Sequence, residues 1–137
     1  MLERLAILVV AALAVGLTVV VIRCWNARRL ARLLGTPLWE NLGEQPDGRS
    51  TVVTFSTPSC AACHQAQAPA VAAVERQLGS HVVRLIRVDA AKRPEVARAF
   101  GVLTVPSTAV LAPKGHLVAV NQGFAPSNKL VEQLQRA

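Results

Sequence analysis

The stretch TVVTFSTPSCAAC (residues 51–63) decides the fold of this 137-residue chain. Residues 51–56 are β-branched and apolar, a composition that predicts a buried strand. A Thr-Pro-Ser turn follows, and residues 60–79 then predict a helix, because their apolar side chains fall on one face. Cys60 and Cys63 therefore stand three positions apart, where a strand gives way to a helix.

The remainder of the chain alternates strand and helix and then closes with a hairpin. We expect a strand over residues 82–88, a short helix over 94–100 closed by Gly101, strands over 107–112 and 116–121, and a last helix from Ser127, its N-cap, to about residue 136. The order β-α-β-α-β-β-α predicts an α/β domain in which a parallel pair of strands is joined to a hairpin.

The position of the two cysteines gives them their chemistry. A thiol at a helix N-terminus faces free backbone N–H groups and the positive end of the helix dipole, and both favour the thiolate. Its pKa is therefore expected to fall below the ordinary thiol value of about 8.5. A spacing of three places the second thiol on the same helical face, one turn deeper. We expect Cys60 to be the nucleophile and Cys63 the thiol that resolves the mixed disulfide.

Two other chemistries use the same residue types. A zinc site would need a second ligand pair, and only Cys24 and three histidines remain in the sequence. The string CAACH (residues 60–64) also matches the attachment signature of c-type haem, with His64 as the proximal ligand. The distal ligand is commonly methionine, and the only methionine is Met1. We expect a redox disulfide with no metal and no cofactor, and a c-type haem electron-transfer protein is the alternative.

A second motif, TVPS (residues 104–107), precedes the third expected strand. A proline is tolerated at the start of a strand, and an X-Pro bond can be cis. If this loop packs against Cys60, Val105 offers a backbone N–H and C=O to an extended substrate segment. We therefore expect Val105 and Pro106 to bind substrate.

Together these features resemble the thioredoxin superfamily over residues 50–137. The matching pieces are the strand over 51–55, the C-x-x-C pair, Val88-Asp89, Phe100-Gly101-Val102, Val105-Pro106-Ser107-Thr108, the Lys114-Gly115 turn and Gly123. The resemblance implies the thioredoxin fold, with helices flanking a mixed central sheet. It also implies dithiol–disulfide exchange in which Cys60 attacks, Cys63 resolves and Pro106 is a cis proline facing them.

The sequence departs from soluble thioredoxins around the cysteines and looks nearer to membrane-tethered thioredoxin-like proteins. The departures are Ser59 for the usual Trp, Ala61-Ala62 for Gly-Pro, Thr54 for a buried acid, Leu85 for the Lys that partners this acid, and Pro69 nine rather than eight residues after the first Cys. The missing acid and the changed dipeptide bear on proton handling and on redox potential.

The N-terminus carries an apolar run, residues 5–22, that contains no charged side chain. At about 1.5 Å per residue such a helix is close to the ~30 Å hydrocarbon thickness of a bilayer. A cleaved signal peptide has a basic start and a small-x-small cleavage site after the apolar run, and this sequence has neither. We expect one uncleaved transmembrane helix, with a basic flank through residue 35, a linker over 36–49 that holds a short element near 38–42, and the thioredoxin-like domain over 50–137.

Charge and composition limit the partners. The net charge is +7, and residues 1–35 contribute five arginines against one glutamate. Four of these arginines follow the apolar run, so the positive-inside rule predicts a cytoplasmic domain, with an extracytoplasmic domain as the alternative. Aromatic residues make up only 4%, too few for a base-stacking platform, so we expect no nucleic-acid binding. An apolar fraction of 52% also excludes intrinsic disorder.

The sequence thus predicts a membrane-tethered thiol–disulfide oxidoreductase. Its expected partners are protein clients that bear disulfides or dithiols, an upstream redox partner, and the membrane itself through residues 5–22. A thioredoxin-fold binding module without catalysis is a further alternative. The compartment bears on the direction of exchange, because the cytosol keeps thiols reduced.

Overall fold

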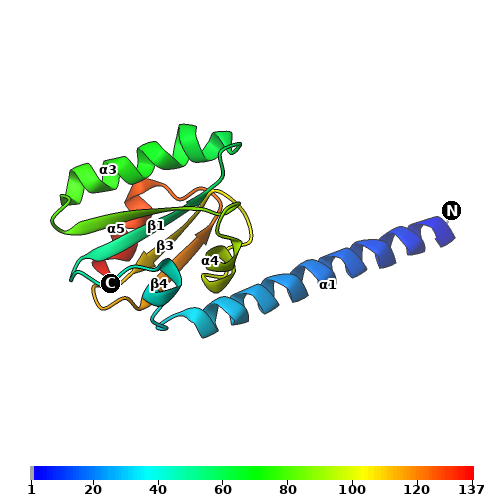
Figure 1. The fold of residues 1–137 in the computed structure, drawn as a ribbon. Helices are drawn as coiled ribbons and strands as arrows, with labels where there is room; N and C mark the ends of the chain where they lie inside the picture. The colour runs from blue at the N-terminus through cyan, green and yellow to red at the C-terminus, as the bar shows by residue number, and fades with distance from the viewer. Residues whose placement is uncertain (1) are drawn as a thin grey trace. The chain divides into compact units, whose positions relative to one another are not determined.

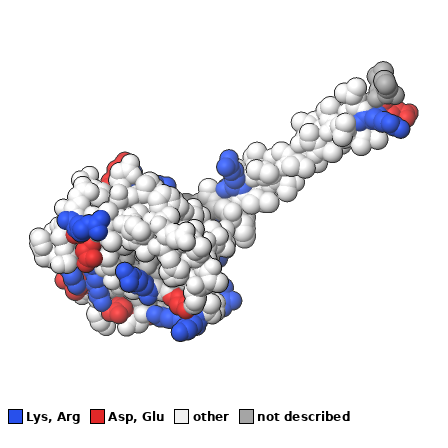
Figure 2. Space-filling view, turned by 90° about the horizontal axis from the view of Figure 1, so that it is seen from above, with Lys and Arg blue, Asp and Glu red and all other residues white. Residues whose placement is uncertain are grey.

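The computed structural model describes residues 2–137 and separates into two units, a helical unit up to Arg32 and a compact unit, Leu33–Ala137. Helix α1 (Leu2–Leu33) includes the predicted apolar span and its helical continuation. The stretch Glu3–Leu33 contains a window of mean hydropathy 3.1 and is long and apolar enough to cross a membrane, a test that a signal sequence also passes. Figure 2 shows the helix uncharged between charged groups towards either end.

The one hydroxyl group inside this span is satisfied within the helix. Thr18 donates its Oγ1 hydrogen to the carbonyl oxygen of Ala14, 2.8 Å away, one helical turn earlier. A polar group that has an internal partner can enter hydrocarbon at low cost, because no bond to water is lost without replacement. The helix is therefore suited to a bilayer in its backbone and in its side chains.

The compact unit is built on a four-stranded sheet in the order β2-β1-β3-β4. The strands are β1 (Ser50–Ser56), β2 (Val83–Asp89), β3 (Ser107–Leu111) and β4 (Leu117–Gln122). Strand β1 pairs in parallel with β2 and antiparallel with β3, and β3 pairs antiparallel with β4. The sheet is mixed, as the resemblance implied, and the thioredoxin fold is confirmed.

Helices cover the sheet and supply its core (Figure 1). They are α2 (Trp39–Leu42), a π-helical turn η1 (Cys63–Gln67), α3 (Ala68–Leu78), α4 (Pro94–Ala99) and α5 (Ser127–Gln135). Helices α3 and α5 contact each other, and their buried apolar side chains join those of the strands in one cluster. Elsewhere in the core, Phe55 of β1 packs against Phe100, with ring centroids 5.4 Å apart.

The helix predicted over residues 60–79 is present, but its first turns are wider than expected. Residues Cys63–Gln67 form a π-helix, in which the N–H of Ala68 bonds to the carbonyl of Cys63, five residues earlier. Pro69 explains the difference, because a proline has no N–H to donate and crowds the carbonyl four residues before it. A widened turn before Pro69 lets α3 begin regularly with the proline at its start.

The expectation that Ser127 caps the last helix is wrong. Pro126 occupies the N-cap position, no side chain caps this end, and Ser127 is already the first helical residue. Pro126 has extended backbone angles, φ −68° and ψ 157°, which end the preceding loop and direct the chain into α5. The fixed φ of Pro126 sets the angle at which the chain enters α5.

The segment over residues 36–49 carries buried side chains of the compact unit, whereas its Pro, Gly and Asp content predicts a linker. Trp39 is 5% exposed and Leu42 3% exposed. The guanidinium of Arg84 lies 5.3 Å from the Trp39 ring centroid. At Gly115, whose φ is +90°, an added Cβ would meet the indole at 1.7 Å, so only glycine fits there.

The start of this segment also pairs with the last strand. The N–H of Gly35 donates to the carbonyl of Leu117 at 2.8 Å, and the N–H of Leu117 donates to the carbonyl of Thr36 at 3.0 Å. An isolated antiparallel bridge joins Pro37 to His116. Residues 35–37 therefore lie along the beginning of β4, on the side away from β3.

Candidate functional site

Cys60 and Cys63 lie just after the carboxyl end of β1 and are joined in a disulfide, with their Cα atoms 5.3 Å apart. Cys60 is half-buried, whereas Cys63 is only 4% exposed. The outer sulfur is thus the one that a partner can reach first, and the inner one lies under the turn. This order matches the roles predicted for the two thiols, which stay a prediction.

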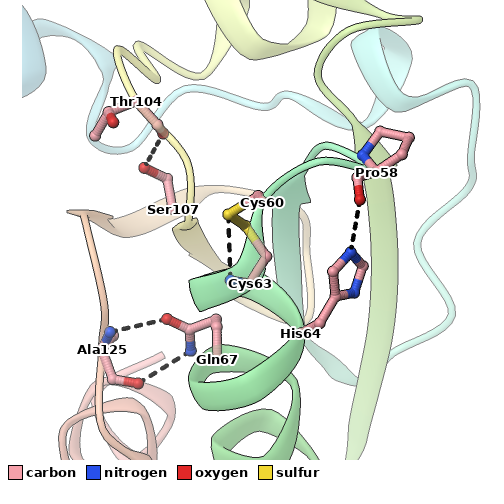
Figure 3. The surroundings of a disulfide bond; sticks show 8 residues. All are labelled: Pro58, Cys60, Cys63, His64, Gln67, Thr104, Ser107 and Ala125. Atoms are coloured by element: carbon pink, nitrogen blue, oxygen red, sulfur yellow. Dashed lines mark hydrogen bonds between the residues drawn. A yellow bond between two sulfur atoms is a disulfide. The ribbon is translucent and has the colours of Figure 1, made fainter.

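The backbone around the pair favours negative charge on the outer sulfur. The N–H of Cys63 points at Sγ of Cys60, at 3.2 Å (Figure 3). When the disulfide is reduced, this donor stabilises a thiolate on Cys60, and the positive end of the helix dipole acts in the same direction. Helix geometry at residues 61–67 supplies the donor, because the first N–H groups of a helix have no partner inside it.

The TVPS loop comes to the same edge of the sheet as the disulfide. Strands β1 and β3 are antiparallel with Phe55 opposite Ser107, so the end of β1 and the start of β3 are neighbours. Figure 3 shows Thr104 and Ser107 beside the cysteine pair. The Val105–Pro106 peptide bond is cis, as the resemblance implied. Ser107 donates its hydroxyl to the carbonyl of Thr104 at 2.6 Å, which holds the loop closed.

Gln122, at the end of β4, hydrogen-bonds the segment that leads into this loop. Its Nε2 donates to the carbonyl of Gly101 at 2.8 Å, and its Oε1 accepts the N–H of Leu103 at 3.0 Å. Within residues 2–137 the backbone N–H and C=O of Val105 take no part in the sheet, whose pairing begins at Ser107. They are therefore free to meet an extended segment of another chain.

A groove of about 300 Å³ borders the loop. The residues that line it come from the end of β2, from α4 and from the loop itself, and they are Ala90, Pro94, Ala97, Arg98, Val102, Leu103, Thr104 and Val105. Most of these side chains are apolar or small, and Leu103 is 57% exposed. The groove can accept an apolar side chain beside the TVPS loop.

One residue of the site has no signal in the sequence motifs. Gln67, one turn after Cys63, is 3% exposed and makes two hydrogen bonds to Ala125 (Figure 3). Its Nε2 donates to the carbonyl of Ala125 at 3.0 Å, and its Oε1 accepts the N–H of Ala125 at 2.9 Å. The bonds tie the turn that carries Cys63 to the loop before α5. A glutamine four residues after the second cysteine, on the same helical face, is the only hint that the sequence contains.

His64 points away from the sulfurs rather than towards them. Its Nε2 lies 3.4 Å from the carbonyl oxygen of Pro58, at the exposed outside of the turn (Figure 3). Thioether bonds to haem would need both sulfurs of the CAACH string, and here these sulfurs are bonded to each other. In the part of the chain that the structure describes, no three side chains of the metal-ligating types lie together. The free cysteine, Cys24, is exposed in α1.

Comparison with known proteins agrees with this geometry. The family model described as thioredoxin matches residues 39–136. No curated protein matches the sequence. The matched range starts at Trp39, in agreement with the burial of that side chain in the compact unit.

Several solved structures have the same fold. The thioredoxin of Fasciola hepatica is 29% identical, with 71% of this chain and 88% of that chain covered and a TM-score of 0.57. Thioredoxin-2 of the malaria parasite, described as a component of a protein secretion machinery, is 26% identical, with 65% and 84% covered and a TM-score of 0.57. A mutant thioredoxin of Halobacterium salinarum is 21% identical, with 66% and 76% covered and a TM-score of 0.58.

Proposed function

Because this chain belongs to the thioredoxin family and carries a bonded cysteine pair, its chemistry is thiol–disulfide exchange, and we propose that it performs this exchange on protein clients from a membrane tether. The observation that supports the proposal best is the N–H of Cys63 directed at Sγ of Cys60 beside an unpaired loop. This arrangement brings together a Cys60 thiol that is easily ionised and a loop whose unpaired backbone groups can bind a client chain.

In the reducing direction the reaction has two displacement steps. The thiolate of Cys60 attacks one sulfur of a client disulfide, forms a mixed disulfide and releases the other client sulfur as a thiolate, which takes up a proton. The thiolate of Cys63 then attacks Sγ of Cys60, forms the Cys60–Cys63 disulfide and releases the second client sulfur. The client gains two electrons and two protons, and the protein loses them. A dithiol reductant upstream must return the pair to the reduced state, and the reverse sequence oxidises a client dithiol.

The client segment is proposed to lie along the TVPS loop. The free N–H and C=O of Val105 can pair with an extended backbone, while the groove beside Leu103 accepts an apolar side chain near the client cysteine. Pro106 follows Val105 and is buried, so it serves as the floor of this contact. Main-chain pairing makes the contact tolerant of sequence, and the groove adds a preference for apolar neighbours.

The tether is proposed to be α1, retained in the mature protein with the compact unit in the cytoplasm. The arginines that follow the apolar span support this orientation through the positive-inside rule. Protease treatment of intact and of opened cells tests it. Cleavage of the compact unit only after the membrane is opened supports a cytoplasmic position, whereas cleavage in intact cells places it outside.

Trapping of the intermediate tests the exchange itself. Full-length protein in detergent, reduced and mixed with insulin, is expected to reduce the insulin disulfides while an added dithiol reductant regenerates it. Cys63→Ser should accumulate a mixed disulfide with insulin through Cys60, and Cys60→Ser should accumulate none. Cys24→Ser is the matched control and should leave the rate unchanged. Equal insulin reduction by Cys60→Ser and wild type would leave only a binding module with this fold.

A further inference from the structure

The inner cysteine borders a cavity of about 200 Å³ that is separate from the client groove. The cavity lies between β1, the π-helical turn, α3 and β2, and the side chains that line it are Thr54, Phe55, Ser56, Cys63, His64, Gln67, Ala68, Val71 and Arg87. This volume holds several water molecules, and its polar lining gives them partners. Cys63 is only 4% exposed, and it borders this cavity.

The charges that line this cavity are all of one sign. Arg87 carries a permanent positive charge, and none of the lining residues is acidic. Arg87 is opposite Thr54 in the parallel register of β1 and β2, so both residues belong to the same face of the sheet as the cavity. Asp89, the next acid along β2, is occupied by the N–H groups of Ala91 and Lys92.

The guanidinium of Arg87 is not neutralised elsewhere. None of the ion pairs found within residues 2–137 involves Arg87, in contrast to its neighbour Arg84, which pairs with Glu44 and Asp47. Arg87 is exposed, but it shares the wall of this cavity with the weakly hydrated thiol of Cys63. An unpaired positive charge there favours the ionised form of that thiol. Strand β1 lines the cavity with the hydroxyl groups of Thr54 and Ser56, and neither hydroxyl can take a proton from Cys63 and keep it.

We infer that Arg87 is a positioning residue for the resolving step, because its charge stabilises the thiolate of Cys63 across this cavity. The inference rests on the proposed function, in which Cys63 must ionise before it attacks Sγ of Cys60. In that step the S–H bond of Cys63 breaks, its proton passes to cavity water and on to solvent, and the electron pair forms the new S–S bond. The client thiolate is the leaving group, so atoms and charge balance without a further reactant.

Titration of the single thiol tests the inference without reference to turnover. Full-length protein in which Cys24→Ser and Cys60→Ser leave Cys63 as the only thiol is titrated by the ultraviolet absorbance of its thiolate. Because Arg87 is exposed and solvent screens its charge, Arg87→Gln is expected to raise the apparent pKa of Cys63 by about half a unit. Arg87→Lys, which keeps the charge, should restore most of the change. Arg76→Gln on the exposed part of α3 removes an equal charge away from the cavity and should leave the titration unchanged.

A raised pKa of Cys63 should also slow the step in which Cys63 attacks the mixed disulfide. When reduced wild-type protein reacts with oxidised glutathione near neutral pH, acid quenching captures the mixed disulfide on Cys60. Arg87→Gln should prolong the life of this species about threefold, because half a pKa unit removes about two-thirds of the thiolate. If Arg87→Gln leaves both the pKa and the lifetime unchanged, or if His64→Gln has the larger effect on the pKa, the inference is wrong. If Cys63→Ser does not prolong the mixed disulfide, the proposed function fails instead, whatever the titration shows.

Discussion

Replacement of Gln67 by leucine tests whether the two bonds to Ala125 hold the site together. Leucine is close to glutamine in size, so the variant removes the amide without opening a large cavity. The backbone N–H and C=O of Ala125 then lose their partners in an interior where Ala125 is fully buried. We expect Gln67→Leu to lower the free energy of unfolding and to loosen the turn that carries Cys63.

The size of the effect follows from the two bonds. A hydrogen bond contributes about 1 kcal/mol net, and a buried backbone group left without a partner costs about 1–3 kcal/mol. The apolar gain from burying leucine offsets about 1 kcal/mol. The expected loss is therefore about 2–4 kcal/mol. With a urea dependence of about 1.5 kcal/mol per molar, the midpoint of unfolding falls by about 1.3–2.7 M.

Urea unfolding of the full-length protein in detergent measures this loss. Trp39 reports the transition by fluorescence, because it is 5% exposed when folded and becomes hydrated on unfolding. Gln65→Leu is the matched control, since Gln65 is exposed in the same π-helical turn and its replacement should change stability by less than about 0.5 kcal/mol. A midpoint for Gln67→Leu within about 0.3 M of wild type would refute the reasoning.

Three more changes are checked by the same urea titration. Phe100→Ala removes a ring that is fully buried against Phe55 and should cost about 3–5 kcal/mol; a loss below about 1 kcal/mol would contradict the observed packing. Asn121→Leu removes the hydrogen bonds of a buried amide to Thr108 and Gln133. The free energy of unfolding should fall by about 2–3 kcal/mol, and a variant as stable as wild type would contradict this account. The hydrogen bond from Arg49 lowers the pKa of Asp47 from its usual 3.8, so this carboxylate stabilises the fold above pH 3.8 and the contribution is lost as the pH falls through the lowered value. Asp47→Asn should therefore be slightly less stable than wild type at neutral pH and equal to it in acid, and a difference that grows in acid would reverse the assignment.

Local signals in the sequence were enough to predict the bonded cysteine pair and the fold. A β-branched run, a Thr-Pro-Ser turn and a cysteine at a helix start are adjacent in the chain, so their arrangement in space follows from local geometry. The order of the later strands followed from alternation and from the turn at residues 113–115. Strand boundaries differ by at most one residue, because a strand ends where its partner ends and not where its composition changes.

Contacts between distant segments could not be predicted in the same way. Gln67 and Ala125 are 58 positions apart, and a lone glutamine on a helix face is usually solvated. The burial of Trp39 depends on Gly115 and Arg84, whereas the Pro, Gly and Asp around it suggested a linker. The π-helical turn had a local cause in Pro69, but a proline near a helix start is compatible with either kind of turn.

Residues 35–37, which run along the start of β4, bear on how copies of the protein would meet one another if α1 anchors them in one bilayer, as proposed. Confinement to a surface brings sheet borders of neighbouring copies together far more often than free diffusion in solution. An uncovered border offers unpaired N–H and C=O groups on which a foreign strand can add. Here the start of edge strand β4 is already paired with Gly35 and Thr36 of the same chain. The other edge strand, β2, carries two arginines. For the tether proposed above, we therefore expect crowded copies to be less prone to pair edge to edge into cross-β aggregates.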